Sequence, residues 1–328
     1  MKKEIIQRHE GYVFSPSDVP YDSVLTFNPA VIKRGNSDYA MVFRNDCYEP
    51  GTEKLGKINL GLAFSKDGIN WNTEKEPIFE LRTDKIHRAY DPRITVIDGT
   101  MYLCFAIDSV YGVQGGIARM SNDFKVEEIL SISTPDNRNM VLFPEKINGK
   151  YIRLERPMPL YGRYGEASEK FDVWLSESPD LVYWGNSKAV LEADDVPFSN
   201  RKIGPGSPPI KTKEGWLTLF HAVDSDPARL GKDVGWDPRW TKRYTIGAML
   251  LDLEDPSKVI AMGKDPLMVP ETDDELFGGF RNNVLFPCAT ILEEDGTVRI
   301  YYGVGDMYVK TASAKLEDLI AFCKGELE

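Results

Sequence analysis

The sequence predicts an all-β fold, a five-bladed β-propeller with a short C-terminal helix. A proline followed by a short mixed run, a turn glycine and an apolar β-rich run recurs five times along the 328 residues. Each copy is typical of a β-hairpin, because a glycine turn between two β-rich runs reverses the chain. Radial repetition of such units is the sequence signature of a propeller, so five copies predict five blades.

The five copies follow one another along nearly the whole chain. They run from Pro29 to Gly35, from Pro92 to Gly99, from Pro144 to Gly149, from Pro208 to Gly215 and from Pro287 to Gly296. Their irregular spacing suits four-stranded blades joined by loops of unequal length. A propeller gathers one loop from every blade at one end of its axis, so residues distant in sequence can build one pocket.

A second repeat has the pattern Ser-x-Asp-x-x-x-Trp. It occurs from Ser65 to Trp71 and again from Ser178 to Trp184, each time after a strand-like run. We interpret it as a turn in which the aspartate accepts backbone hydrogen bonds, and the tryptophan packs between blades. We assign no catalytic role to these tryptophans.

The repeats indicate one domain that covers residues 1–328. No Gly/Ser-rich or Pro-rich linker interrupts them. Residues 1–20 are predicted to form an N-terminal arm. Residues 315–328 are predicted to form a C-terminal helix, because the run from Leu316 to Leu327 carries apolar residues at helical spacing.

Composition excludes several classes of function. The net charge of −11 argues against a protein that tracks a nucleic-acid backbone, and no apolar run approaches membrane-spanning length. Four cysteines stand far apart and only three histidines occur, so neither a disulfide framework nor a metal site is indicated. We expect a cytoplasmic protein without a metal or organic cofactor.

Polar residues near the ends of the inner strands are the first candidates for chemistry, because these positions converge on the propeller axis. They are Asn28, Arg44, Asn45, Asp46, Asp91, Arg93, Arg138, Asn139, Arg153, Arg156, Lys202, His221 and Asp306. Carboxylates bind sugar hydroxyls or donate protons, whereas arginine and lysine select phosphate. A pocket that holds both kinds would suit group transfer between a sugar and phosphate.

These residue types also fit structural roles. Asp91 precedes a proline, a pattern that is common in turns. Arg153 and Arg156 could be surface partners of Glu145 or Glu155. His221 lies in an apolar run and could be a core histidine whose hydrogen bonds are satisfied. The residues alone leave these alternatives open.

Several of the motifs quoted above, with their flanking residues, resemble family 130 of the glycoside hydrolases. The resemblance rests on Asp91 to Thr95, Val141 to Gly149, Arg153 to Pro157, Lys202 to Pro209 and Tyr301 to Asp306, and its motifs extend in order from Asn28 to Asp306. Members of that family are mostly mannoside phosphorylases with a five-bladed propeller. The chain departs from many members in having Gly-Val-Gly before Asp306, where they have Gly-Ala-Ala.

The resemblance implies a role for each matching residue. Asp91 would be the catalytic acid and would pass its proton to the glycosidic oxygen through the 3-hydroxyl of the mannose. The mannose would be held by Asn28, Arg44 and Asp306, and the phosphate by Arg138, Asn139, Arg156, Lys202, His221 and Tyr244. The implied enzyme is a hexosyltransferase that carries out reversible, inverting phosphorolysis of β-mannosides, most readily β-1,4-linked, to give α-mannose 1-phosphate.

Elementary chemistry agrees with this layout. An inverting glycosidase needs an acid and a second carboxylate as base, because water is a poor nucleophile. Phosphate is already anionic and needs no base. One acid opposite a group of basic side chains is therefore expected for inverting phosphorolysis.

Other functions remain as alternatives: a β-1,2-mannoside phosphorylase, a β-mannoside hydrolase and, from a different class, a non-catalytic carbohydrate-binding propeller. The segment 224–242, which contains Trp236 and Trp240, is either a lid at the acceptor site or a surface excursion. Tyr161 and Tyr164 are further candidates for the acceptor site. The expected partners are a β-mannoside, inorganic phosphate as co-substrate and, by resemblance, further copies of the chain in a homo-oligomer.

Overall fold

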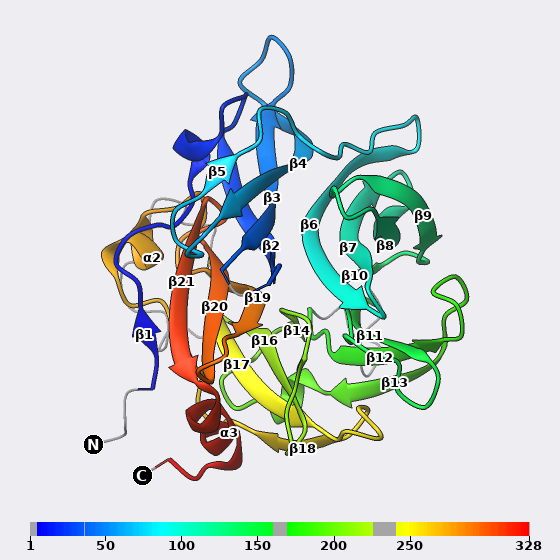
Figure 1. The fold of residues 1–328 in the computed structure, drawn as a ribbon, viewed down its shortest axis with the longest axis vertical. Coiled ribbons are helices and arrows are strands. Elements are labelled where there is room, and N and C mark those ends of the chain that lie inside the picture. The colour runs from blue at the N-terminus through cyan, green and yellow to red at the C-terminus, as the bar shows by residue number, and fades with distance from the viewer. Residues whose placement is uncertain (1–4, 36, 160–168, 226–240, 328) are drawn as a thin grey trace.

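A computed structural model describes the chain except for residues 1–4, 36, 160–168, 226–240 and 328. Five antiparallel sheets follow one another around a central axis, each with its first strand innermost (Figure 1). The predicted five-bladed β-propeller is confirmed.

Each blade is built from strands that are consecutive in the chain, except that one strand of blade 5 comes from the other end of the chain. Blade 1 contains β2 (Leu25–Lys33), β3 (Tyr39–Tyr48), β4 (Leu55–Ser65) and β5 (Asn72–Thr73). Blade 2 contains β6 (Ile86–Ile97), β7 (Thr100–Ser109), β8 (Gly112–Met120) and β9 (Val126–Ile132). Blade 3 contains β10 (Asn137–Leu142), β11 (Tyr151–Pro157), β12 (Val173–Ser178) and β13 (Gly185–Leu191).

The last two blades depart from this simple pattern. Blade 4 contains β16 (Trp216–Asp224), β17 (Arg243–Leu251) and β18 (Val259–Met262), and its inner edge is split into β14 (Ile203–Pro205) and β15 (Ile210–Lys211), which both pair with β16. Blade 5 contains β19 (Leu285–Leu292), β20 (Thr297–Val304), β21 (Tyr308–Lys315) and, from the other end of the chain, β1 (Gln7–Arg8).

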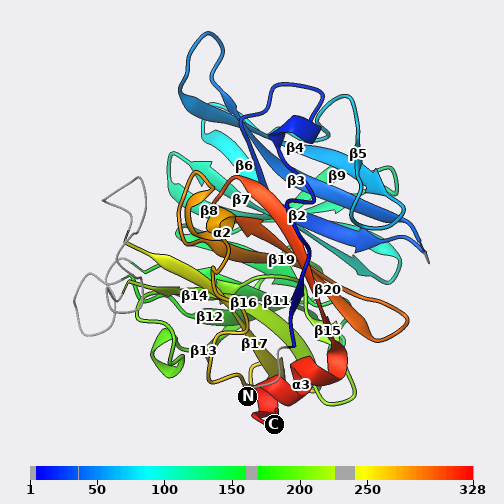
Figure 2. The same cartoon turned by 90° about the vertical axis from the view of Figure 1, so that its left-hand side faces the viewer.

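The strand β1 closes the ring. Gln7 lies opposite Ser313 and Arg8 opposite Ala312, so β1 becomes the outer strand of blade 5 (Figure 2). The Arg8 guanidinium forms an ion pair with the buried Glu275 and donates from Nη2 to the carbonyl oxygen of Val269 at 2.8 Å.

Helical elements are short and lie outside the sheets. The described part of the chain has two α-helices, α2 (Asp273–Phe277) and α3 (Leu316–Lys324), and two 3-10 turns at Pro16–Asp18 and Ala193–Asp195. The predicted C-terminal helix is confirmed as α3. It ends at Gly325, whose φ of 71° suits glycine best. In the part of the chain that the structure describes, no helix is long and apolar enough to cross a membrane.

Apolar cores fill the spaces between adjacent blades. Trp216 and Phe143 pack between blades 3 and 4, and Tyr302 and Leu319 belong to the cluster between blades 4 and 5. The apolar cluster between blades 2 and 3, which includes Tyr102, is smaller.

The Ser-x-Asp-x-x-x-Trp repeats form the predicted turns. Ser65 Oγ accepts from the Gly68 amide at 2.8 Å, and Asp67 Oδ1 accepts from two further backbone amides. The indole of Trp71 packs edge-on against Tyr301 of blade 5, with 6.1 Å between ring centroids. Trp184 donates to Ser131 Oγ of blade 2 at 3.3 Å. Both tryptophans therefore join neighbouring blades.

Candidate active site

The inner strands of the first three blades carry the same backbone irregularity. β2, β6 and β10 each contain a β-bulge, and at the bulges Asn28, Asp91 and Asn139 have positive φ angles of 47°, 55° and 60°. Asparagine and aspartate are among the few non-glycine residues that adopt this conformation readily. A bulge leaves one residue unpaired and re-aims its side chain, and all three of these side chains line one cavity.

This cavity has a volume of about 270 Å³ and receives side chains from all five blades. Of the residues to which the family resemblance gives a role, it contains all except His221: Asn28, Arg44, Asp91, Arg138, Asn139, Arg156, Lys202, Tyr244 and Asp306. Residues separated by most of the chain therefore meet at one end of the axis, as the propeller hypothesis requires.

Asp91 is the most heavily hydrogen-bonded carboxylate in the cavity. Its Oδ1 atom accepts from Asn28 Nδ2 at 2.9 Å and from Arg44 Nη1 at 3.1 Å, and its Oδ2 atom accepts from Arg138 Nη2 at 2.8 Å. Burial alone would raise the pKa of Asp91. The guanidiniums of Arg44, Arg138 and Arg93 outweigh burial and lower this pKa to about 2.

Arg44 is held rigidly beside Asp91. Its Nε and Nη2 atoms donate to the two carboxylate oxygens of Asp46 at 2.6 and 2.7 Å, which is the bidentate geometry that arginine favours. Its guanidinium lies 4.3 Å from the ring centroid of Phe27 and 4.7 Å from that of Tyr90. Packing and hydrogen bonding thus fix the orientation of this cation before any ligand binds.

The second cavity carboxylate, Asp306, has the opposite electrostatic character. Burial raises its pKa to about 6, with Arg44 opposing the shift and the charge of Asp91 adding to it. Asp306 follows β20 and has a positive φ of 53°. One cavity therefore holds two carboxylates whose pKa values are pushed apart, a pattern that assigns different tasks to chemically similar groups.

Lys202 and Arg156 form the basic part of the cavity together with Arg138. Burial, with Arg156 as the next contributor, lowers the pKa of Lys202 to about 7. Burial and the neighbouring Arg138 lower the pKa of Arg156, although a guanidinium stays protonated in proteins. Asp91 offsets the charge of Arg138, whereas Arg156 and Lys202 form no ion pair within the described residues, so this part of the cavity is prepared for an anionic ligand.

His221 lies behind Arg156 and not on the cavity wall. Its Nε2 atom is 2.8 Å from Arg156 Nη1. Its ring stacks on Phe286, with 4.5 Å between centroids and an angle of 29° between the planes. Burial and the charge of Arg156 lower the pKa of His221 well below its ordinary value.

Sequence reasoning missed the aromatic and aliphatic part of the cavity wall, which consists of Phe27, Tyr90, Val284 and Phe286, and it also missed the charged Arg88. A signal was present, because an aromatic residue directly precedes Asn28, Asp91 and Pro287 in the repeated motif. Tyr90 is fixed by its hydroxyl, which donates to Asp108 Oδ1 at 2.6 Å.

Two candidate arginines lie outside this cavity. Arg93 is buried, with Nε and Nη1 donating to the carbonyl oxygens of Gly206 and Pro92 at 2.6 and 2.7 Å. Arg153 forms an ion pair with Glu155 at 2.8 Å, the partner considered from the sequence, but the pair is buried between blades 2 and 3 and not exposed.

Part of the candidate acceptor site lies outside the described residues. This applies to Tyr161, Tyr164, Trp236 and Trp240, and to most of the segment 224–242. Within the described residues, no group of three or more His, Cys, Asp or Glu side chains is placed to hold a metal ion.

Comparison with known proteins identifies the family. A family model described as β-1,4-mannooligosaccharide phosphorylase matches residues 2–325. The chain belongs to glycoside hydrolase family 130. The resemblance noted in the sequence is thereby confirmed.

Characterised family 130 relatives include enzymes named for different linkages. The chain is 33% identical to a 1,2-β-oligomannan phosphorylase of Thermoanaerobacter sp., over 91% of this chain and 93% of the relative. It is 32% identical to a β-1,4-mannooligosaccharide phosphorylase of Ruminococcus albus, over 98% of this chain and 92% of the relative. The solved β-1,2-mannobiose phosphorylase of Listeria innocua, in complex with β-1,2-mannobiose, superposes with a TM-score of 0.79 at 25% identity, covering 97% of this chain and 99% of that one.

Proposed function

We propose that this family 130 protein is a β-mannoside phosphorylase, a hexosyltransferase that converts a β-mannoside and inorganic phosphate into α-mannose 1-phosphate and a shortened saccharide. The observation that carries the proposal is the single cavity in which Asp91 faces Arg138, Arg156 and Lys202. Its relatives are named as phosphorylases of β-1,4- and β-1,2-linked mannosides, which supports the same reaction class.

In the proposed reaction, phosphate binds among the basic side chains and attacks C1 of the mannose from the face opposite the leaving group. The C1–oxygen bond to the acceptor breaks as the new C1–O–P bond forms, so the configuration inverts. The proton of Asp91 passes through the 3-hydroxyl to the glycosidic oxygen, and the proton of the hydrogen phosphate restores Asp91. Arg138, Arg156 and Lys202 position the phosphate, and Asn139 and Tyr244 complete its site.

An acid catalyst must carry a proton, whereas the two arginines bound to Asp91 favour its ionised form. Arg138 is placed to resolve this conflict, because it lines the cavity and lies within hydrogen-bonding distance of Asp91 Oδ2. When phosphate binds, Arg138 also interacts with the phosphate, so it stabilises the ionised form of Asp91 less. The pKa of Asp91 then rises, so phosphate binding prepares the acid.

The proposed sugar contacts come from the residues around Asp91. Asn28, Arg44 and Asp306 line the cavity around Asp91 and offer both donors and acceptors to mannose hydroxyls. With a pKa near 6, Asp306 is ionised at neutral pH and accepts hydrogen bonds from those hydroxyls. His221 contributes indirectly, by holding Arg156.

The test is the release of α-mannose 1-phosphate from β-1,4-mannobiose, with and without inorganic phosphate. We expect product only when phosphate is present, and about 10²–10⁴-fold slower formation by Asp91→Asn at matched protein concentration. Free mannose formed at the same rate in both reactions would identify a hydrolase and refute the proposal. Binding of mannobiose without turnover would identify the non-catalytic carbohydrate-binding alternative.

A β-1,2-mannoside phosphorylase is the second candidate, because the relatives named for the two linkages are almost equally similar to this chain. Values of kcat/KM for β-1,4- and β-1,2-mannobiose, measured under the same phosphate concentration, distinguish the two. We expect the β-1,4-linked substrate to be preferred. A larger value for β-1,2-mannobiose would assign the other linkage.

The cellular setting is also a proposal. The four cysteines are free and buried, which is consistent with a reducing compartment, and we propose the cytoplasm. We further propose a homo-oligomer and a reaction that needs no metal or organic cofactor. Light scattering on the purified protein tests the first point, and unchanged activity after exhaustive dialysis against EDTA tests the second.

A further inference from the structure

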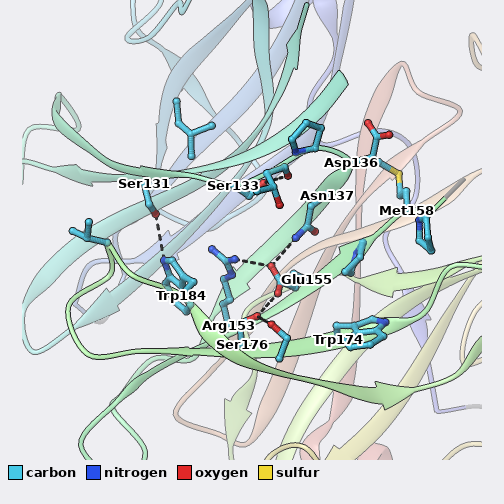
Figure 3. A pocket seen from close by; sticks show the side chains of 17 residues that line it. Ser131, Ser133, Asp136, Asn137, Arg153, Glu155, Met158, Trp174, Ser176 and Trp184 are labelled. Atoms are coloured by element: carbon cyan, nitrogen blue, oxygen red, sulfur yellow. Dashed lines mark hydrogen bonds and ion pairs between the residues drawn. The ribbon is translucent and has the colours of Figure 1, made fainter. Parts of the chain in front are cut away.

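A second and larger cavity opens between blades 2 and 3, away from the candidate active site. This cleft has a volume of about 630 Å³ (Figure 3). It is bounded by the end of β9 and the start of β10 on one side, and by β11, β12 and β13 on the other. No residue is shared with the 270 Å³ cavity, and the proposed reaction uses none of the residues that line the cleft.

A buried and electrically balanced polar cluster lies in the cleft. Glu155 accepts from Asn137 Nδ2 at 2.8 Å, from Arg153 Nη2 at 2.8 Å and from the hydroxyl of Ser176. In Figure 3 these side chains converge on the Glu155 carboxylate. Because one carboxylate offsets one guanidinium, the cleft has no uncompensated charge in this cluster and is not prepared for an anion.

Two polar atoms of this cluster have no hydrogen-bond partner among the described residues. They are the acceptor Asn137 Oδ1 and the donor Arg153 Nε. Asn137 is 9% exposed and Arg153 is 5% exposed, so both side chains are more than nine-tenths buried. Both atoms have almost no accessible surface, so a ligand in the cleft reaches them only if the side chains of Asn137 and Arg153 rotate toward it. Buried polar atoms normally have partners, and a ligand that supplies a donor and an acceptor would favour this rotation.

The rest of the cleft wall combines two indoles and several hydroxyl groups with apolar side chains and the carboxylate of Asp136. Trp184 and Trp174 line it, and the guanidinium of Arg153 lies 4.1 Å from the ring centroid of Trp184. Trp184 is fixed by its Nε1 atom, which donates to the carbonyl oxygen of Leu181 at 3.0 Å. At the rim, Ser187 Oγ lies 3.0 Å from Ser176 Oγ. Rigid indoles beside hydroxyl groups and paired charges match the alternating apolar and hydroxyl surfaces of a sugar ring.

We propose that the cleft between blades 2 and 3 is a second, non-catalytic binding site for a neutral saccharide. In this site Asn137 and Arg153 rotate toward the ligand, so that Asn137 Oδ1 accepts from a ligand hydroxyl and Arg153 Nε donates to a ligand oxygen. Trp174 packs against the sugar ring. The inference does not depend on the proposed reaction, because it concerns binding at a separate cavity. A manno-oligosaccharide is the first ligand to try, and a cello-oligosaccharide shows whether the site distinguishes sugars.

The site shares its supporting strands with the candidate active site. On β10, Asn137 lines the cleft and the next residue, Arg138, lines the 270 Å³ cavity. On β11, Glu155 lines the cleft and Arg156 the active-site cavity. Occupancy of the cleft would therefore stabilise the strand pair that positions two of the proposed phosphate ligands.

The experiment is calorimetric titration with β-1,4-mannotriose and cellotriose in the absence of phosphate. The cleft variant is Ser187→Trp, which fills the cavity from an exposed position, and Ser187→Ala is its matched control. Trp174→Ala removes one wall, and Asp306→Ala disables sugar binding in the candidate active site. Melting temperatures show that each variant folds.

We expect a binding event that persists in Asp306→Ala and Ser187→Ala and is weakened at least tenfold in Ser187→Trp and Trp174→Ala. This result would support the cleft even if no mannoside turnover were found, so the two proposals fail independently. Titrations that Ser187→Trp and Trp174→Ala leave unchanged would overturn the inference, as would the absence of any binding to Asp306→Ala. Binding of inorganic phosphate that Ser187→Trp abolishes would overturn the assignment to a neutral ligand.

Discussion

Arg156 Nη1 lies 2.8 Å from His221 Nε2, and this contact fixes the charge state of the histidine. A guanidinium has donors and no acceptor, so Nε2 must accept and the proton of the neutral ring sits on Nδ1. The low pKa of His221, caused by burial and by Arg156, agrees with this assignment. A neutral histidine thus orients a cation without competing for its charge.

His221→Ala tests the contribution of this contact to phosphate binding. His221→Ala leaves Arg156 without its buried partner and free to rotate, so the KM for phosphate should rise about 10- to 100-fold, the value of a hydrogen bond to a charged group. The KM for the mannoside should change much less. Steady-state kinetics with each substrate varied in turn measure both. His221→Asn retains an amide acceptor and should recover part of the loss. Equal changes in both KM values would show that His221 has only a structural role.

Asp91→Asn tests the proton donor. The amide cannot supply a proton, so we expect kcat to fall by about 10²–10⁴-fold while the protein stays folded. Circular dichroism and a melting curve provide the control for folding. Turnover within a factor of ten of the wild type would rule out Asp91 as the acid.

The same residue should leave a signature in acid unfolding. The folded-state pKa of Asp91, about 2, is below its ordinary value of 3.8. Its ion pairs therefore contribute stability that is fully present above pH 4 and is lost as the pH falls toward 2. Denaturant unfolding at a series of pH values should show a steeper loss between pH 4 and 2 for the wild type than for Asp91→Asn. Identical slopes would contradict the low pKa.

Lys202 should make anion binding depend on pH. Its pKa of about 7 in the free protein means that the ammonium loses its proton as the pH rises through neutrality. Sulfate keeps one charge state over this range. Its Kd should therefore rise about tenfold per pH unit above pH 7, because protonating Lys202 costs ~1.4 kcal/mol more for each unit by which the pH exceeds its pKa. Lys202→Met should bind sulfate weakly and without this pH dependence. A constant Kd from pH 6 to pH 9 in the wild type would refute the assignment.

Gly204 should tolerate no side chain. A Cβ atom there would lie 2.5 Å from Cε1 of His221 and 3.0 Å from Cδ of Arg156. Gly204→Ala should therefore displace both side chains and raise the KM for phosphate, with a smaller effect on the mannoside. Gly185→Ala is the matched control, because nothing lies within 4 Å of its Cβ position. Kinetics for Gly204→Ala that match those of Gly185→Ala would show that the His221–Arg156 pair has room to adjust.

The number of blades was readable from the sequence because each blade repeats a local signal. The turn at Asp98 and Gly99 illustrates it, since both residues have the positive φ that a tight hairpin turn requires. The polar side chains of the active-site cavity were readable for the same reason, because Asn28 and Asp91 occupy equivalent places in successive repeats.

What the sequence did not reveal depends on the direction in which side chains point. Arg153 and Arg156 lie on one short strand, yet they face opposite sides of the sheet and enter different cavities. Histidine is a residue type that can bind phosphate directly, but His221 lies behind Arg156. No pattern along the chain predicts how deeply this side chain is buried. The bulges that aim Asn28, Asp91 and Asn139 into the axis are features of strand pairing, and they appear only once two strands are aligned.

The pairing of β1 with β21 in blade 5 has a consequence for how the protein folds during its synthesis. Residues 7 and 8 leave the ribosome long before their partners on β21, Ala312 and Ser313, are synthesised. The active-site cavity likewise needs Asn28 and Asp306 together. A nascent chain can form its early blades one by one, yet it acquires a complete pocket only when strands separated by nearly 280 residues, those that carry Asn28 and Asp306, come together.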